Sequence, residues 1–223
     1  GTLPGVFIDN PYPNAVNGSL WTLPVEATAY AIIGLLGVLG LMLRRWGAAA
    51  AFLIALILAS PLINLDALIS VSTENAAGEV GAGQIMTLFA IFLGGSLLYV
   101  CRKQIVLNWW IAAAAVVIWY SASGSVWINT VGPLTIPYLV VVGAYRTPKS
   151  WRRLTRHGDV SYGVYIYSFP LQQAVAATWL GVSAAGMFLI AAPLAYIAGA
   201  ASWKLIERPA LALKSRLPRK TLR

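Results

Sequence analysis

The sequence predicts an all-α fold: a polytopic integral membrane helix bundle with about seven spans in 223 residues. Hydrophobic residues make up 59% of the chain and charged residues only 10%, and the mean hydropathy is +0.73. Soluble domains carry about a quarter charged residues, so this chain lacks the charge for a solvated surface. A membrane helix needs roughly 20 apolar residues, and seven apolar segments approach that length. We therefore expect the lipid bilayer to be its solvent.

The seven apolar segments are residues 22–43, 48–64, 84–101, 105–120, 131–145, 159–180 and 184–206. The second, fourth and fifth are short, and Pro61, Pro133 and Pro137 lie within or beside them. Because proline removes a backbone donor and clashes with the preceding turn, we expect these three segments to be tilted, kinked or partly re-entrant. Small residues at close-packing spacing, Gly34, Gly37 and Gly40 and then Ala195 with Gly199, predict tight helix contacts.

Basic residues predict one orientation. They follow the first, third, fifth and seventh segments, in clusters at residues 44–45, 102–103, 146–156 and 214–223. Seven spans place all four clusters on one side, and basic loops remain in the cytoplasm. Residue 1 then lies outside and the C-terminus inside. We divide the chain into an extracytoplasmic entry segment, 1–21, a transmembrane bundle, 22–206, and a basic cytoplasmic tail, 207–223.

Several functions are disfavoured by the composition. The net charge of +9 lies in short clusters between apolar runs, which favours a membrane surface and argues against nucleic acid. A single His157 and a single Cys101 exclude the usual His/Cys zinc arrangements from this chain alone, so we expect no metal. No phosphate-binding Gly-x-x-x-x-Gly-Lys is present.

The first polar stretch at a helix entry is "VNGSLWTLPVEATAY", residues 16–30. Pro24 suits the first helical position, and Glu26 in the first turn interacts favourably with the helix dipole. That structural explanation does not exclude a pocket. Tyr30 lies four residues after Glu26, so both side chains share one helix face and offer a polar patch to the bundle.

The second stretch is "SYGVYIYSFPLQQ", residues 161–173. A polar stripe at helical spacing comprises Ser161, Tyr165, Ser168 and Gln172, and Tyr162 and Phe169 form an adjacent stripe. Pro170 deprives the Ile166 carbonyl of its usual backbone partner. Interhelical hydrogen bonding alone explains part of this pattern, but four polar groups ending at a kink favour a polar crevice.

The third stretch, "WKLIERPALALK", covers residues 203–214. Lys204 and Arg208 suit snorkelling at the inner end of the last span. Pro209 is expected to stop or bend the helix.

These three stretches, in this order, resemble the later motifs of acyltransferase family 3, the bacterial O-antigen acetylase type of membrane O-acyltransferase. "SLWTLPVE" is the most specific piece. The resemblance implies a ten-span fold with both termini cytoplasmic, in the bacterial inner membrane. It also implies transfer of an acetyl or other acyl group from cytosolic acyl-CoA to a hydroxyl of an extracytoplasmic glycan or glycolipid. Seven spans with an outside start leave room for three earlier ones.

The chain departs from the family pattern in two ways. The family's proposed catalytic His, in its first span, and its Arg motif, near the second, are absent, and His157 does not lie in that motif. Ser168 stands where many members have His. We therefore expect the C-terminal portion of such an enzyme, inactive alone, which needs the N-terminal part or a partner chain. No permanently bound cofactor is expected; acyl-CoA, acetyl-CoA first, is the donor substrate.

The resemblance implies three groups of site residues, and it places no catalytic residue in this chain. The acceptor side comprises Asn17, Ser19, Trp21, Glu26 and Tyr30. The connecting route comprises Tyr165, Ser168 and Gln172. The acyl-CoA entrance comprises Arg152, Arg153, Arg156, Ser161 and Tyr162.

Two other functions stay open from the sequence. In a membrane transporter or flippase, the polar stripe and proline kinks would line a path; the lack of a visible internal repeat disfavours it. A structural membrane subunit without its own chemistry would account for the missing His.

Overall fold

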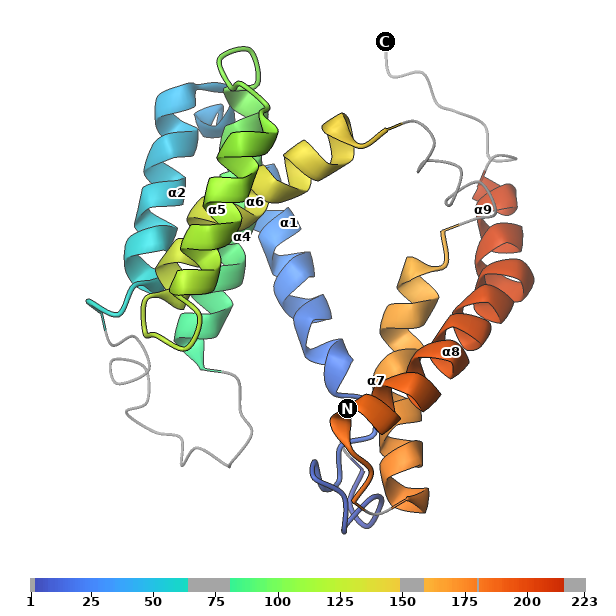
Figure 1. The fold of residues 1–223 in the computed structure, drawn as a ribbon. Helices are drawn as coiled ribbons and strands as arrows, with labels where there is room; N and C mark the ends of the chain where they lie inside the picture. The colour runs from blue at the N-terminus through green and yellow to red at the C-terminus, as the bar shows by residue number, and fades with distance from the viewer. Residues whose placement is uncertain (1–2, 64–80, 149–158, 180, 215–223) are drawn as a thin grey trace. The chain divides into compact units, whose positions relative to one another are not determined.

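The computed structural model describes residues 3–63, 81–148, 159–179 and 181–214, and the regular elements within them are helical. Each predicted apolar segment overlaps one main helix, with ends that differ by several residues (Figure 1). These are α1 (Thr22–Val38), α2 (Arg45–Ala59), α4 (Ala82–Val100), α5 (Trp109–Ser121), α6 (Ile128–Arg146), α7 (Ser161–Thr178) and α8 (Ala184–Ser202). The predicted all-α class is confirmed.

Four helical stretches in the described residues are long and apolar enough to cross a membrane: Gly18–Val38, Ala82–Val100, Ile128–Arg146 and Ala184–Leu213. At most 28% of each span is buried within the protein, which leaves apolar surface for lipid. α2 and α5 are short apolar helices, as their segments predicted. The fifth segment differs from expectation, because α6 reaches 19 residues with Pro133 and Pro137 inside it. The orientation of the helices in the cell stays a prediction.

The chain divides into two compact units, and the boundary falls in the first turn of α1. Gly1–Leu23 together with Ser150–Arg223 form one unit, here called the terminal unit. Pro24–Lys149 form the other, here called the central unit. Each unit is described by itself.

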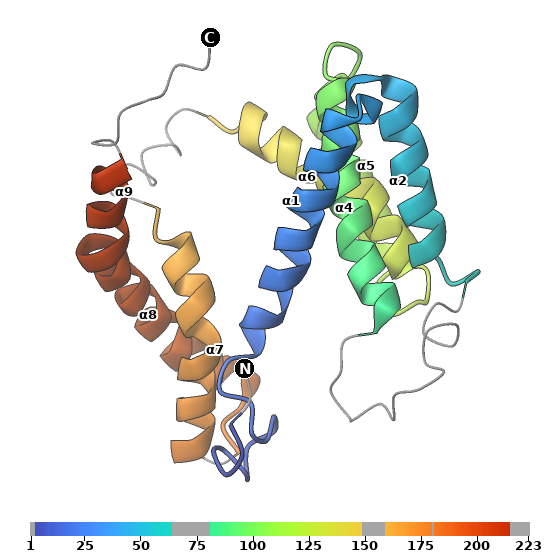
Figure 2. The same cartoon turned by 180° about the vertical axis from the view of Figure 1, so that it is seen from behind.

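In the central unit, successive helices run in alternating directions (Figures 1 and 2). Its core is a cluster of buried residues from the α1–α2 connection, α2 and α4: Met42, Ala48, Phe52, Ala55, Ala90 and Leu93. At Gly94, a Cβ would lie 3.0 Å from Pro137 Cγ and 3.1 Å from Phe52 Cε2. The missing side chain therefore lets α4 pack closely against both α2 and α6.

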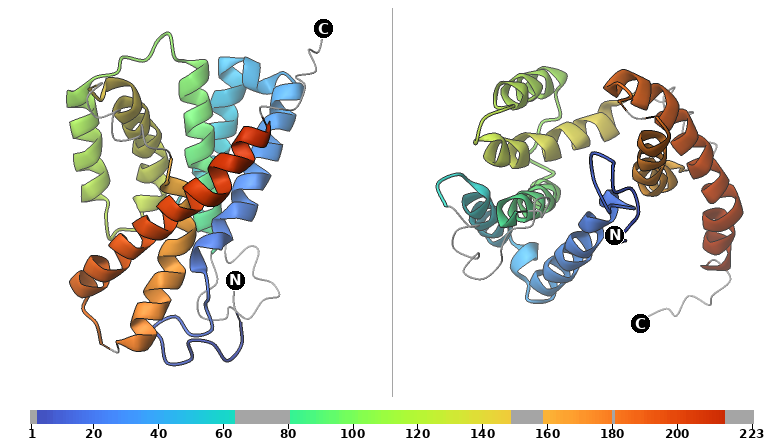
Figure 3. Two further views of the ribbon diagram at one scale, coloured as in Figure 1. Left: turned by 90° about the vertical axis from the view of Figure 1, so that its right-hand side faces the viewer. Right: turned by 90° about the horizontal axis from the view of Figure 1, so that it is seen from below.

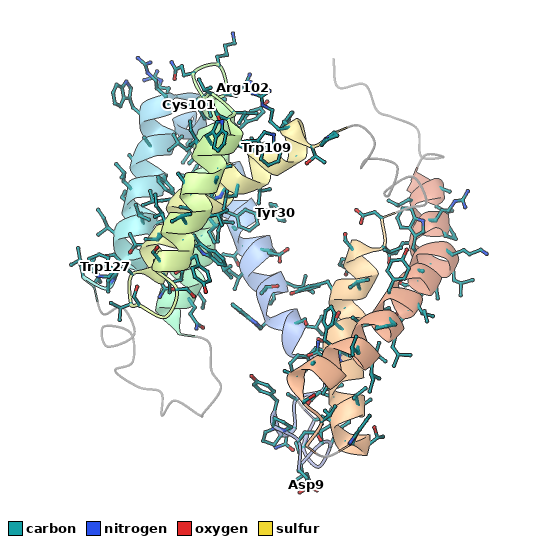
Figure 4. All side chains as sticks on the ribbon, viewed as in Figure 1. Asp9, Tyr30, Cys101, Arg102, Trp109 and Trp127 are labelled. Carbon is teal, nitrogen blue, oxygen red and sulfur yellow. The ribbon has the colours of Figure 1, made fainter. Side chains whose placement is uncertain are left out.

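The alternating directions bring the basic residues of the central unit to one end. Arg45 begins α2, Arg102 follows α4, and Arg146 ends α6. Figure 4 shows Arg102 at the opposite end of this unit from Trp127. These three arginines thus share one end of the central unit, as the charge pattern predicted. The side of the membrane that this end faces stays a prediction.

In the terminal unit, α7 and α8 run in opposite directions and cross (Figure 3). A Cβ on Gly163 would lie 2.6 Å from Gly199 Cα, so the two backbones meet without an intervening side chain. The predicted close contact at Ala195 and Gly199 is confirmed, since both are buried. The same prediction at Gly34, Gly37 and Gly40 is wrong for the described residues, because a Cβ at each would meet open space.

Pro209 does not stop the last helix. α8 continues through a π-helical turn, Trp203–Glu207, into α9, Arg208–Lys214. The Arg208 amide donates to the Trp203 carbonyl five residues back, and a π turn is a known way to absorb an irregularity in a helix. The predicted tail therefore begins inside a helix, and its residues 215–223 lie outside the described part.

Glycine-to-alanine substitutions at two positions test the close α7–α8 contact. We expect Gly163→Ala to lower the free energy of unfolding by about 1–3 kcal/mol, because its methyl group overlaps the Gly199 backbone. Gly143→Ala in α6 meets open space and should be neutral or stabilising, since alanine favours helix. Thermal unfolding in detergent measures both; equal effects would contradict the assigned contact.

Candidate functional site

The first motif stretch lies against the second. The described part of the entry segment contacts α7 through Tyr165, Ile166, Phe169 and Gln173. Tyr165, Phe169 and Gln173 are spaced by four residues, so they follow one face of α7. All of these contacts lie within the terminal unit. The two motifs therefore form one local structure.

The central contact joins Asn17 to the turn of α7 that precedes Pro170. Pro170 has no amide hydrogen to give Ile166, four residues earlier, and the Asn17 Nδ2 donates to the Ile166 carbonyl at 2.9 Å. Asn17 is 8% exposed, and its Oδ1 accepts from the Ser19 amide at 3.0 Å. The predicted free carbonyl is thus satisfied by a side chain from the other motif.

Tyr165 attaches the next part of the entry segment. Its hydroxyl donates to the Ser19 carbonyl and also pairs with Thr22 Oγ1. A phenol carries a single proton, so with that proton on Ser19 the Thr22 hydroxyl must be the donor to Tyr165. In this arrangement both hydrogen-bonding contacts of the Tyr165 hydroxyl are made to the entry segment and the residue after it.

A buried amide pair anchors the start of the entry segment. Gln173 is 3% exposed and donates through Nε2 to the Tyr12 carbonyl at 2.7 Å and the Ala15 carbonyl at 2.6 Å. Asn10, 6% exposed, donates through Nδ2 to the Gln173 backbone carbonyl at 2.8 Å and to its Oε1 at 3.2 Å. Buried polar groups are costly unless paired, so this network favours one docking position.

Phe169 fills the space between these polar contacts. Its ring lies 6.0 Å from that of Tyr12, at 59°. A Cβ at Gly18 would stand 2.6 Å from Phe169 Cε2. Glycine at position 18 therefore lets the entry segment pass directly over the aromatic ring.

The other predicted residues of the terminal unit lie elsewhere. The Ser168 hydroxyl donates to the Val164 carbonyl of its own helix. Gln172 is exposed, as are Tyr162 at 55% and Trp21 at 39%. Of the predicted stripe, only Tyr165 meets the entry segment. Ligand contact by any of these residues stays a prediction.

The predicted acyl-CoA entrance is described only in part. Arg152, Arg153 and Arg156 lie outside the described residues. Ser161 opens α7, and its amide and hydroxyl donate to Asp159 Oδ1 at 3.0 and 2.5 Å. The bond from the Ser161 hydroxyl, and to a smaller extent the bond from its amide, hold the pKa of Asp159 below its ordinary value of 3.8.

Glu26 and Tyr30 belong to the central unit. Glu26 is partly buried. The prediction that it lies in the first turn of the helix is wrong, because α1 begins at Thr22 and has no acidic residue in its first turn. The Tyr30 ring packs edge-on against Phe92 of α4, with centroids 5.4 Å apart. Tyr30 is still 63% exposed (Figure 4).

Sequence reasoning missed Asn10 and Gln173. The signal for Gln173 was present, because counting by fours from Tyr165 leads through Phe169 to Gln173, whereas counting from Ser161 led to Gln172. Asn10 carries no such signal, since it lies in an irregular segment and pairs with a residue 163 positions away.

Comparison with known proteins finds one related protein. The chain is 29% identical over 215 residues to Nodulation protein 10 of Rhizobium leguminosarum bv. viciae. The alignment covers 90% of this chain and 56% of the relative, so the chain spans about half the length of that protein. Neither a family model nor a solved structure matches.

The Asn17 contact predicts a specific rescue. We expect Asn17→Leu to lower the free energy of unfolding by about 1–3 kcal/mol, because it leaves the Ile166 carbonyl without its donor. In a Pro170→Ala background the loss should be smaller, since the new alanine amide can donate to the same carbonyl.

Equilibrium unfolding of the four proteins in this double-mutant cycle measures the coupling. Asn17→Leu also removes the bond from the Ser19 amide to Asn17 Oδ1. This loss occurs in both backgrounds, so it cancels from the coupling energy. Strictly additive effects would contradict the assignment.

Asp159 predicts a pH dependence. Its lowered folded pKa adds stability that is present above the unfolded pKa, about 3.9, and is lost as pH falls through the folded pKa. Ser161→Ala should raise the Asp159 pKa toward 3.8 by removing the larger cause. A ¹³C carboxyl NMR titration measures the Asp159 pKa.

Ser168→Ala is the control, because the Ser168 hydroxyl bonds to its own helix, and this variant should leave the Asp159 pKa unchanged. Equal Asp159 pKa values in the wild type and in Ser161→Ala would show that the Ser161 hydroxyl does not lower this pKa.

Proposed function

We propose that the chain is part of a membrane O-acyltransferase that moves an acyl group, acetyl first, from cytosolic acyl-CoA to a hydroxyl of an extracytoplasmic glycan or glycolipid. One observation carries this proposal. The two stretches that resemble acyltransferase family 3, around Asn17 and around Tyr165, pack together through side chains characteristic of those stretches. Residues separated by almost 150 positions thus contribute to one structure, as a shared site requires.

The reaction sets clear demands. The acceptor oxygen bonds to the thioester carbonyl carbon, the carbon–sulfur bond breaks, and CoA leaves as the thiol with the acceptor's proton. A base must take that proton, and donors must stabilise the oxyanion that forms. Tyr165 and Asn17 have their hydrogen-bonding groups engaged with the fold. We therefore assign them to the wall of the site and place the base in a part of the enzyme that this chain does not contain.

The entry segment suits the acceptor. Trp21 ends the short 3-10 helix Gly18–Trp21, two residues after the anchored Ser19, and 39% of it is exposed. A partly exposed aromatic face on a fixed backbone can stack on a sugar ring. This assignment requires the predicted orientation, in which residue 1 lies on the outer side of a bacterial inner membrane.

The relative supports this proposal through its length. The aligned region covers 56% of Nodulation protein 10, so this chain matches one portion of a longer bacterial protein. The donor, the acceptor and the need for an N-terminal part or partner chain are all elements of the proposal.

The direct test is transfer of radiolabelled acetyl from acetyl-CoA to glycan in membranes that contain the full-length protein. We expect Trp21→Ala and Glu26→Gln each to reduce transfer at least tenfold, because the resemblance implies an acceptor-side role for each residue. Trp110→Ala is the matched control, since this Trp is 84% exposed at the start of α5, and it should transfer normally.

Two results would contradict the proposal. Normal transfer by both Trp21→Ala and Glu26→Gln would remove the acceptor wall. Transfer by residues 1–223 alone would show that the base lies within this chain.

A further inference from the structure

The central unit contains an apolar cavity that the proposed acyl transfer does not use. Its volume is about 510 Å³, within the roughly 300–1,000 Å³ of small-molecule sites. It lies between α4, the α4–α5 loop (residues 101–108) and α6, and Leu98, Ile105, Leu107 and Val141 form apolar walls. An alkyl chain suits this lining.

One guanidinium group lines this cavity, and a second is hydrogen-bonded to its wall. Arg102 lines it, donates to the Tyr99 carbonyl at 2.9 Å, and lies 4.4 Å above the Tyr99 ring. Arg146 donates to the carbonyl of the lining residue Leu107 at 2.7 and 3.0 Å. A guanidinium has five N–H donors, so among the described residues both retain donors for an anion.

The cavity is held open by the fold. Tyr138 Oη donates to the Val106 carbonyl at 2.8 Å and accepts from the Asn108 amide at 3.1 Å. With the Arg146 contacts, these bonds fix the α4–α5 loop on α6. The wall therefore does not need a ligand to form.

A second hollow shares the same arginine. It has a volume of about 750 Å³ and is lined by Ile33, Met42, Leu43 and Phe92. Gly95, Tyr99 and Arg102 line both spaces. Arg102 thus contributes to two largely apolar spaces.

We propose that this pair of spaces binds one anionic phospholipid, with its phosphate on Arg102 and Arg146 and one acyl chain in each space. Basic pockets between membrane helices hold anionic lipid headgroups. The two spaces match the two chains of a phospholipid. Coenzyme A offers a single tail and several phosphates, which suits this site less well. Trp109 lies at the same end of the central unit as Arg102 (Figure 4), and it is exposed, as is the adjacent Trp110. Exposed Trp residues are enriched at membrane interfaces, where lipid headgroups lie.

The experiment uses the purified full-length protein and native mass spectrometry. Phosphatidylglycerol and phosphatidylcholine with identical chains are titrated separately. We expect the wild type to bind phosphatidylglycerol about tenfold more tightly, and Arg102→Gln to abolish that preference. Lys103→Gln is the matched control, because Lys103 carries the same charge in the same loop but lines neither space.

A second pair of variants tests the cavity without changing charge. Gly95→Leu should reduce phosphatidylglycerol binding about tenfold, because its side chain enters open space that both hollows share. Gly34→Leu, which also meets open space but lines neither hollow, should bind normally. Thermal unfolding identifies any variant that fails to fold. If one variant fails, the other pair of variant and control tests the proposal.

Three results would overturn the proposal: equal binding of the two lipids by the wild type, wild-type binding by both Arg102→Gln and Gly95→Leu, or displacement of phosphatidylglycerol by an equimolar acyl-CoA of the same chain length. The last would assign the cavity to the acyl donor. None of these results bears on the acetyl-transfer test, which uses other residues.

Discussion

The hydrogen bond from the Asn17 amide to the Ile166 carbonyl joins the two motif stretches of this protein. It exists because Pro170 cannot donate to that carbonyl, so this part-buried acceptor lacks its usual donor within α7. Leaving a buried acceptor unpaired costs about 1–3 kcal/mol. An asparagine side chain supplies the missing donor from a segment without regular structure. The turn before Pro170 thereby becomes a binding position for the entry segment.

The remaining contacts of the entry segment follow from this position. Once Asn17 is placed, the Ser19 carbonyl meets Tyr165, and Gly18 passes over Phe169. Gln173 then holds the backbone further upstream. These polar groups are engaged with one another, so in the proposed acyltransferase they would form part of the wall and other residues would carry the proton chemistry. The proposed acyltransferase role accordingly depends on a base outside this chain.

The sequence allowed the fold class to be predicted well, because composition and segment length are direct consequences of a lipid solvent. Seven apolar segments became seven main helices. The free carbonyl at Ile166 was also predictable, since proline chemistry alone defines it. Its partner Asn17 was not, because an irregular segment has no periodicity to show which face it meets. Gln173 was missed for a related reason: the polar stripe of α7 has two possible starting points, and only tertiary packing distinguishes them.

The most direct measurement is the ¹³C carbonyl chemical shift of Ile166. Ile166–Tyr167 is the only Ile-Tyr pair in the chain, so ¹³C-carbonyl isoleucine with ¹⁵N-tyrosine gives a single cross-peak that reports this carbonyl. Hydrogen bonding moves a carbonyl carbon downfield. The signal should therefore move upfield in Asn17→Leu and stay in place in Asn108→Leu, which removes a helix cap in the central unit. An unchanged Ile166 signal in Asn17→Leu would contradict the account.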